Sequence, residues 1–87
     1  MPRVFIPSQL RNLTAGLAET EVAGSTVREL VVALDCQFPG IQNRLEKDGE
    51  LSPALQVSID GTFSRRGLDA KVQPTSEVHF LPIFGGG

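Results

Sequence analysis

Residues 26–40, TVRELVVALDCQFPG, carry the strongest local signal in this chain. The first four match a capping box, in which the Thr26 hydroxyl and the Glu29 carboxylate accept hydrogen bonds from amides at the start of a helix. Apolar residues then recur at steps of three and four, which predicts an amphipathic helix with one buried stripe. The stripe consists of Val27, Leu30, Val31, Leu34 and Phe38. Pro39 and Gly40 end the helix.

Two strands are predicted on the N-terminal side of this helix. Residues 3–7 are rich in β-branched and aromatic side chains and are closed by a proline, which is typical of a strand. A polar turn over residues 8–16 leads to residues 17–22, where two glutamates alternate with apolar and small residues. This alternation favours a strand with one face in water.

A hairpin and a final strand are predicted on the C-terminal side. Residues 55–59 alternate between apolar and polar side chains, which predicts a strand. Asp60-Gly61 is a favoured two-residue hairpin turn, and residues 62–64 then form the return strand. The last strand covers residues 77–81 and is closed by a proline.

The segments between these strands supply the remaining core residues. We expect a short turn over residues 41–45 to bury Ile41 and Leu45, and residues 47–53 to form an exposed polar loop. The segment before the last strand is ambiguous in structure, but it contains two further expected core anchors, Leu68 and Val72.

The predicted order of elements is strand, strand, helix, strand, short strand and strand. One helix laid across one face of a mixed sheet is an α+β arrangement. We expect a β-grasp (ubiquitin-like) fold, with one main helix packed on a mixed sheet of four to five strands. Residues 1–82 are expected to form this domain, and residues 83–87 to form a flexible C-terminal tail ending in Gly-Gly.

Composition limits the functions open to this chain of 87 residues. Hydrophobic residues make up 40% and charged residues 21%, as in ordinary globular domains, and no apolar run is long enough to span a bilayer. The net charge of -2 and the lack of Trp and Tyr argue against nucleic-acid binding. One cysteine, Cys36, and one histidine, His79, exclude a disulfide and a Cys/His metal cluster. We expect a soluble cytoplasmic protein with no bound metal or cofactor.

Residues 83–87, IFGGG, end the chain. Three terminal glycines add nothing to a packed fold, so they indicate either an inert tail or a slender peptide that enters another protein's active site. They follow the last predicted strand with no polar spacer between, which favours the second interpretation.

The end of the chain resembles that of the MoaD/ThiS class of small sulfur carriers, the prokaryotic relatives of ubiquitin. In that class a strand is followed by a proline, two apolar residues, a small residue and Gly-Gly. Here the pattern falls on Leu81, Pro82, Ile83-Phe84, Gly85 and Gly86-Gly87, with Gly85 in place of the usual alanine. The helix start over residues 26–30 and the turn over residues 59–61 are also similar, so the resemblance covers nearly the whole chain.

This resemblance implies a protein cosubstrate rather than an enzyme, with no catalytic residue of its own. A separate adenylating enzyme would use ATP to activate the carboxylate of Gly87, which would then carry sulfur as a thiocarboxylate to a biosynthetic acceptor. Gly85 and Gly86 would give the tail clearance in narrow active sites. Four apolar residues are expected to dock on the partners: Phe63, Leu81, Ile83 and Phe84.

The opening segment, residues 5–11 (FIPSQLR) followed by residues 14–16 (TAG), resembles the carriers that donate sulfur in cysteine biosynthesis. The implied acceptor is then a cysteine synthase-like enzyme. Three alternatives stay open. One is the small subunit of molybdopterin synthase, which acts with the large subunit in molybdenum cofactor biosynthesis. The others are a ubiquitin-like modifier that forms isopeptide bonds and an interaction module with inert glycines.

Three other features have simpler explanations. Cys36 lies opposite the apolar stripe on a helical wheel, and its neighbours do not activate a thiol. His79 alternates with apolar residues as the surface positions of a strand do, without an evident carboxylate partner. The pair Arg65-Arg66 is typical of a solvated turn, although it could also meet an acidic surface on a partner.

Overall fold

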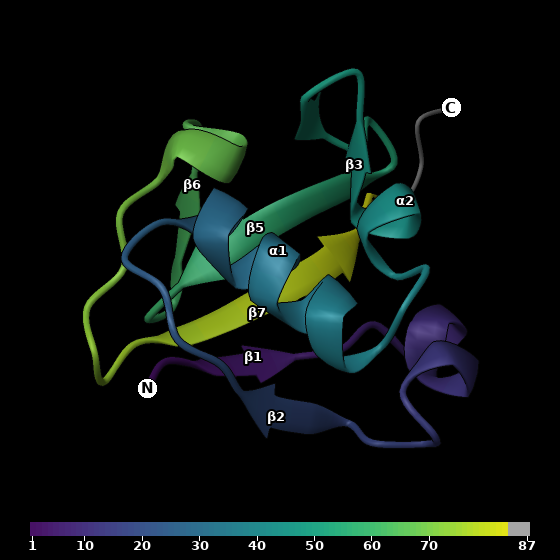
Figure 1. Ribbon diagram of the computed structural model, residues 1–87. Helices are drawn as coiled ribbons and strands as arrows, with labels where there is room; N and C mark the ends of the chain where they lie inside the picture. The colour runs from purple at the N-terminus through teal and green to yellow at the C-terminus, as the bar shows by residue number, and fades with distance from the viewer. Residues whose placement is uncertain (84–87) are drawn as a thin grey trace.

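The computed structural model describes residues 1–83 and has a five-stranded mixed sheet with its main helix packed on one face (Figure 1). The strands are β1 (Arg3–Phe5), β2 (Glu19–Glu21), β5 (Leu55–Ile59), β6 (Thr62–Ser64) and β7 (Glu77–Pro82). Their order across the sheet is β2-β1-β7-β5-β6. The predicted α+β, β-grasp architecture is therefore confirmed. None of the helices within residues 1–83 combines the length and apolar character needed to cross a membrane.

The first and last strands pair in parallel at the centre of the sheet. Their register aligns Val4 with Val78 and Phe5 with His79. β2 continues the sheet beyond β1, and β5 and β6 continue it beyond β7, in each case by antiparallel pairing. Parallel neighbours need a long crossover. Here the crossover includes α1 (Val27–Gln37), which lies across one face of the sheet.

The start of α1 is capped as the sequence predicts. Thr26 Oγ1 accepts a hydrogen bond from the Glu29 amide at 3.2 Å. The Glu29 carboxylate accepts from the amide and the hydroxyl of Ser25, at 2.8 and 3.1 Å. It therefore satisfies the residue before the cap rather than the cap itself, and the two side chains together pin the chain at the helix entrance.

A short helix, α2 (Gln42–Leu45), follows α1 directly. The Asp35 carboxylate, near the end of α1, accepts a hydrogen bond from the Gln42 amide at 3.0 Å and so joins the two helices. Ile41 and Leu45 are fully buried, which confirms the core positions expected for this segment.

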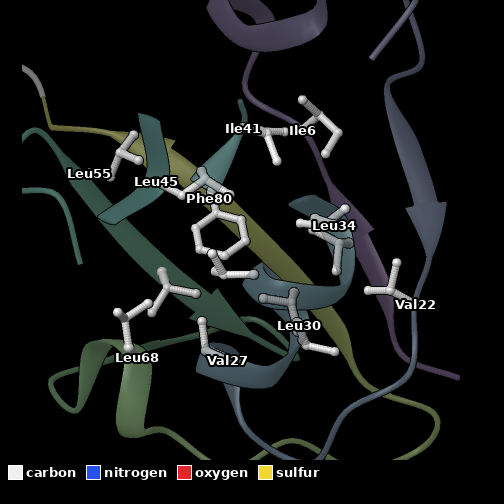
Figure 2. Packing of buried hydrophobic residues seen from close by; sticks show 14 of the residues in the cluster. Ile6, Val22, Val27, Leu30, Leu34, Ile41, Leu45, Leu55, Leu68 and Phe80 are labelled. Atoms are coloured by element: carbon white, nitrogen blue, oxygen red, sulfur yellow. The ribbon is translucent and has the colours of Figure 1, made fainter. Parts of the chain in front are cut away.

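A single apolar core fills the space between the helices and the sheet (Figure 2). Phe80, in the central strand β7, is 1% exposed, and its ring stands among side chains from the helical layer. The two anchors expected before the last strand, Leu68 and Val72, are also buried. The core residues labelled in Figure 2 are Ile6, Val22, Val27, Leu30, Leu34, Ile41, Leu45, Leu55, Leu68 and Phe80.

The prediction of a polar turn over residues 8–16 was wrong in part. Residues Ser8–Leu13 form a 3₁₀ helix, η1. Leu10, at its centre, is only 3% exposed. Burial of this side chain draws the segment onto the core, and a tight helix satisfies the backbone groups that a loop would leave unpaired there.

The prediction of an exposed loop over residues 47–53 was also wrong in part. The strands β3 (Glu46–Lys47) and β4 (Glu50–Leu51) form a small hairpin. Asp48 and Gly49, between them, have φ angles of 54° and 81°. Asp-Gly with two positive φ angles is a hairpin turn of the same type as Asp60-Gly61. The same type of Asp-Gly hairpin turn therefore occurs twice in this chain.

The Asp60-Gly61 turn joins β5 to β6 as predicted, with φ angles of 52° and 87°. The Asp60 carboxylate also accepts hydrogen bonds from residues that are distant in the sequence. Asp60 Oδ2 accepts from the Ser76 hydroxyl and Oδ1 from the Glu77 amide, each at 2.9 Å. These bonds tie the hairpin to the first residue of β7 and so help to set the register of the last strand.

Replacement of Leu34 by alanine is expected to lower the free energy of unfolding by about 2–5 kcal/mol, because this side chain is fully buried beneath α1. Val32→Ala serves as the control, since Val32 lies on the same helix but is 48% exposed. Its effect is expected to stay within about 0.5 kcal/mol. Urea denaturation followed by circular dichroism measures both values, and equal losses in the two variants would contradict this assignment of the buried face.

Candidate functional site

The two faces of the five-stranded sheet have different surroundings. Side chains of β7 alternate, so Val78 and Phe80 point into the core and are buried, whereas His79 and Leu81 point to the other side and are partly exposed. We call this second side the outer face. α1 lies on the side opposite to it (Figure 1).

Strand register gathers aromatic side chains into one row of the outer face. Phe5 is opposite His79, His79 is opposite Ser58, and Ser58 is opposite Phe63. The rings of Phe5 and His79 stack, with centroids 4.0 Å apart and an interplanar angle of 2°. Phe63, at the edge of the row, is 57% exposed. The row thus combines a stacked pair with an exposed aromatic ring.

The next row leads to the root of the C-terminal tail. Leu81 is opposite Gln56 on the outer face. One residue beyond β7, the Ile83 amide donates to the Ala54 carbonyl at 2.9 Å. This bond holds the chain against β5, and Ile83 remains 49% exposed. The predicted docking residues Phe63 and Ile83 are therefore exposed and Leu81 is partly exposed, and Phe63 and Leu81 share the outer face.

Four of the predicted site residues lie outside the described residues. They are Phe84, assigned to docking, Gly85 and Gly86, assigned to clearance, and Gly87, assigned to carry sulfur. What the structure does establish is where the preceding segment ends: at the margin of the outer face, on the extension of the central strand.

We call Pro82 and Ile83, which precede the last four residues of the C-terminal tail, the tail root. A depression of about 360 Å³ lies beside Pro82, between the end of β1, η1 and the end of β7. Phe5, His79 and Leu81 contribute its apolar wall, and Arg11 contributes a cation. Arg11 Nε donates to the Ile6 carbonyl at 3.2 Å, which orients the guanidinium at this position. Neither Arg11 nor Phe5 was predicted to belong to a site.

These additional residues have a common cause. Parallel pairing of β1 with β7 brings Phe5 onto His79 and carries the following turn, with Arg11, to the tail root. This pairing joins opposite ends of the chain, so no local sequence pattern predicts it. The only sequence signal was the occurrence of Phe5 and Arg11 in the opening segment that resembles the cysteine-biosynthesis carriers.

Of the other candidate residues, Cys36 stays apart from this surface. Cys36 is exposed on α1, in agreement with the helical-wheel prediction. Across residues 1–83, no three His, Cys, Asp or Glu side chains come together in a way that could hold a metal ion. The arrangement of the described residues is thus suited to recognition by another protein, with an apolar and aromatic face next to the departing tail.

Comparisons with known proteins agree with this geometry. The ThiS family matches residues 4–87 of the chain. A candidate sulfur carrier protein of Archaeoglobus fulgidus is 31% identical over 89 residues, covering 98% of this chain and 97% of the relative. A chain in the crystal structure of the Amycolatopsis orientalis BexX/CysO complex is 31% identical, with a TM-score of 0.92 over 100% of both chains. Mycobacterium tuberculosis CysO, described as an antigen, is 25% identical, with a TM-score of 0.87 over 94% of this chain and 98% of that one.

Proposed function

The chain belongs to the ThiS family, and on that premise we propose that it carries sulfur as a thiocarboxylate on its C-terminal glycine, Gly87. The observation that carries this proposal is the family match over residues 4–87, which includes the glycine tail. The fold supports it, because the last described residue, Ile83, is held beside an accessible face from which a tail of four residues leads to the end of the chain.

The proposed chemistry takes place in two steps on partner proteins. An oxygen of the Gly87 carboxylate bonds to the α-phosphorus of ATP, and pyrophosphate leaves. A sulfur nucleophile then attacks the acyl carbon, AMP leaves, and the carboxylate oxygen is replaced by sulfur. Three consecutive glycines give a peptide without Cβ atoms, which suits entry into two different narrow active sites. The carrier is therefore a cosubstrate, as members of its family are, and ATP is bound by the activating partner.

The outer face is the proposed docking surface for the adenylating enzyme. It presents Phe63 and Leu81, with Ile83 at its margin, and it includes the stacked pair of Phe5 and His79, in which Phe5 lies on the far side of β7 from Phe63. Large aromatic side chains that become buried on association contribute most to protein–protein affinity. A partner that covers this face also meets the tail root, so recognition and delivery of the tail occur together.

We assign the acceptor to cysteine biosynthesis, with a cysteine synthase-like enzyme as the receiving partner. The opening segment over residues 5–11 supports this branch. The high structural similarity to two CysO chains agrees with it. A molybdopterin synthase large subunit is the acceptor in the alternative branch.

The first expected result concerns the mass of the intact protein. Incubation with ATP, a sulfide source and the adenylating enzyme is expected to raise the mass by one oxygen-to-sulfur exchange. Deletion of Gly87 is expected to abolish the shift, because the terminal carboxylate then belongs to Gly86 and falls one residue short of the partner's active site. Cys36→Ser is expected to keep it, since the exposed thiol lies on α1 and takes no part.

An unchanged mass for the intact chain with every adenylating enzyme of the organism would overturn the carrier proposal. Recovery of Gly87 in isopeptide linkage to lysines of other proteins, without a thiocarboxylate form, would instead establish a protein modifier. Loss of the shift in Cys36→Ser would show that the exposed thiol takes part in the reaction.

The second expected result tests the docking surface. Phe63→Asp is expected to weaken binding to the adenylating enzyme at least about tenfold, because it places a charge in the apolar contact. Val32→Asp is the matched control, since Val32 is similarly exposed (48% against 57%) but lies on α1, on the opposite side of the sheet. Isothermal titration calorimetry measures both affinities, and circular dichroism confirms that both variants are folded. Equal affinities would rule out the outer face as the docking surface.

A further inference from the structure

A groove of about 310 Å³ lies at the β6 edge of the sheet, and its rim carries three arginines. Arg65 and Arg66 directly follow β6, and Arg28 comes from the first turn of α1. Leu51, Leu55 and Leu68 are among the apolar residues that line the groove. We refer to this feature as the arginine groove.

The arginines of this groove differ in how they are held. Arg28 is fully engaged: its guanidinium donates to the Gly49 carbonyl at 2.8 Å and to Asp69 Oδ1 at 3.0 Å. Within residues 1–83 the ion pairs join Arg28 to Asp69 and Arg3 to Glu19, so no carboxylate there holds Arg65 or Arg66. Both are exposed. Two carboxylates line the groove: Asp69 is paired with Arg28, and Glu50 forms no ion pair with Arg65 or Arg66. The three arginines therefore leave the groove with an excess of one positive charge over Asp69 and Glu50.

The arginine groove adjoins the proposed docking surface. Arg65 comes two residues after Phe63, the exposed aromatic of the outer face. The groove also includes Leu55 and Gln56, which pair with Pro82 and Leu81 at the end of β7. Where the strands are in register, β6 is separated from β7 by β5 alone, a spacing of about 10 Å. The groove opens on the helix side of the β6 edge, so a partner that covers Phe63 and extends around this edge also meets the arginine groove.

The charge of this edge is opposite to that of the rest of the chain. The protein carries a net charge of -2, and the opposite edge strand, β2, exposes Glu21 together with Glu19, which is paired with Arg3 at 3.8 Å. An acidic partner surface is thus attracted to one edge of the sheet and repelled by the other. Such an asymmetry orients a small protein during encounter and raises the association rate.

We propose that Arg65 and Arg66 form the positively charged part of the docking surface and bind an acidic surface of the adenylating enzyme. This inference rests on the proposed function and adds the chemistry of the partner. The apolar outer face supplies contact area, while the arginine pair selects the orientation in which the tail root faces the partner. The two arginines act in positioning and take no part in the transfer of sulfur.

The test uses full-length chains in the ATP–pyrophosphate exchange reaction of the adenylating enzyme. Arg65→Glu/Arg66→Glu is expected to raise the KM for the carrier about tenfold or more at low salt, with little change in kcat. The dependence of kcat/KM on sodium chloride concentration is expected to become weaker or to reverse. Each single variant, Arg65→Glu or Arg66→Glu, is expected to show a smaller effect of the same kind.

Lys71→Glu is the matched control for the single variants, because it makes the same change of charge at an exposed residue outside the arginine groove. It is expected to raise the KM clearly less than either single arginine variant, because Lys71 lies outside the groove and its charge acts on the docked partner through more solvent. Thermal unfolding by circular dichroism shows whether all variants are folded. None of the three side chains is buried, so no large change is expected.

The outcomes separate this inference from the proposal on which it rests. A wild-type chain that is not adenylated would overturn both. A wild-type chain that is adenylated, with the arginine variants equal to Lys71→Glu in KM and in salt dependence, would overturn the electrostatic docking alone. A loss of kcat without a change in KM would also contradict it, since it would place the arginines in the chemical step.

Discussion

The parallel pairing of β1 with β7 is the constraint on which the rest of this structure depends. It joins the first strand of the chain to the last one, and it puts both in the middle of the sheet. Val4, Val78 and Phe80 are buried beneath α1 as a result. A parallel pair in a chain this short requires nearly the whole sequence as its crossover, so the helix and the hairpin find their positions relative to these two strands.

The same pairing determines how the tail is presented. The chain enters its last segment from a central strand that has neighbours on both sides, and the bond from Ile83 to Ala54 extends this support by one more residue. The tail root is thereby held by the most buried part of the molecule. A small carrier gains from this arrangement, because a rigid exit directs a short peptide into a partner's active site without a large loss of entropy on binding.

Recognition and chemistry occupy different parts of the chain. The outer face and the arginine groove lie on the folded domain, whereas the proposed sulfur-carrying atom lies on Gly87, the last residue of the sequence. A carrier must bind both an activating enzyme and an acceptor. Both partners recognise the same folded domain, but each acts on a different chemical form of the C-terminus, so the two functions need separate parts of the chain. The stacked pair of Phe5 and His79 forms an aromatic patch on the outer face, and Arg65 and Arg66 are proposed to orient the partner on it.

Local features could be predicted from the residues themselves. The capped helix from Thr26, the Asp60-Gly61 turn and the apolar stripe each depend on neighbours within a few positions, so sequence patterns were sufficient for them. The hairpin at Asp48-Gly49 carried the same signal and was overlooked, whereas the 3₁₀ helix around Leu10 depends on burial. Tertiary structure alone decided that Phe5 stacks on His79, that Arg11 lies at the tail root, and that Arg28 neutralises Asp69 beside Arg65 and Arg66. These contacts join residues far apart in the chain, and they arise only when the register of the central strands is set.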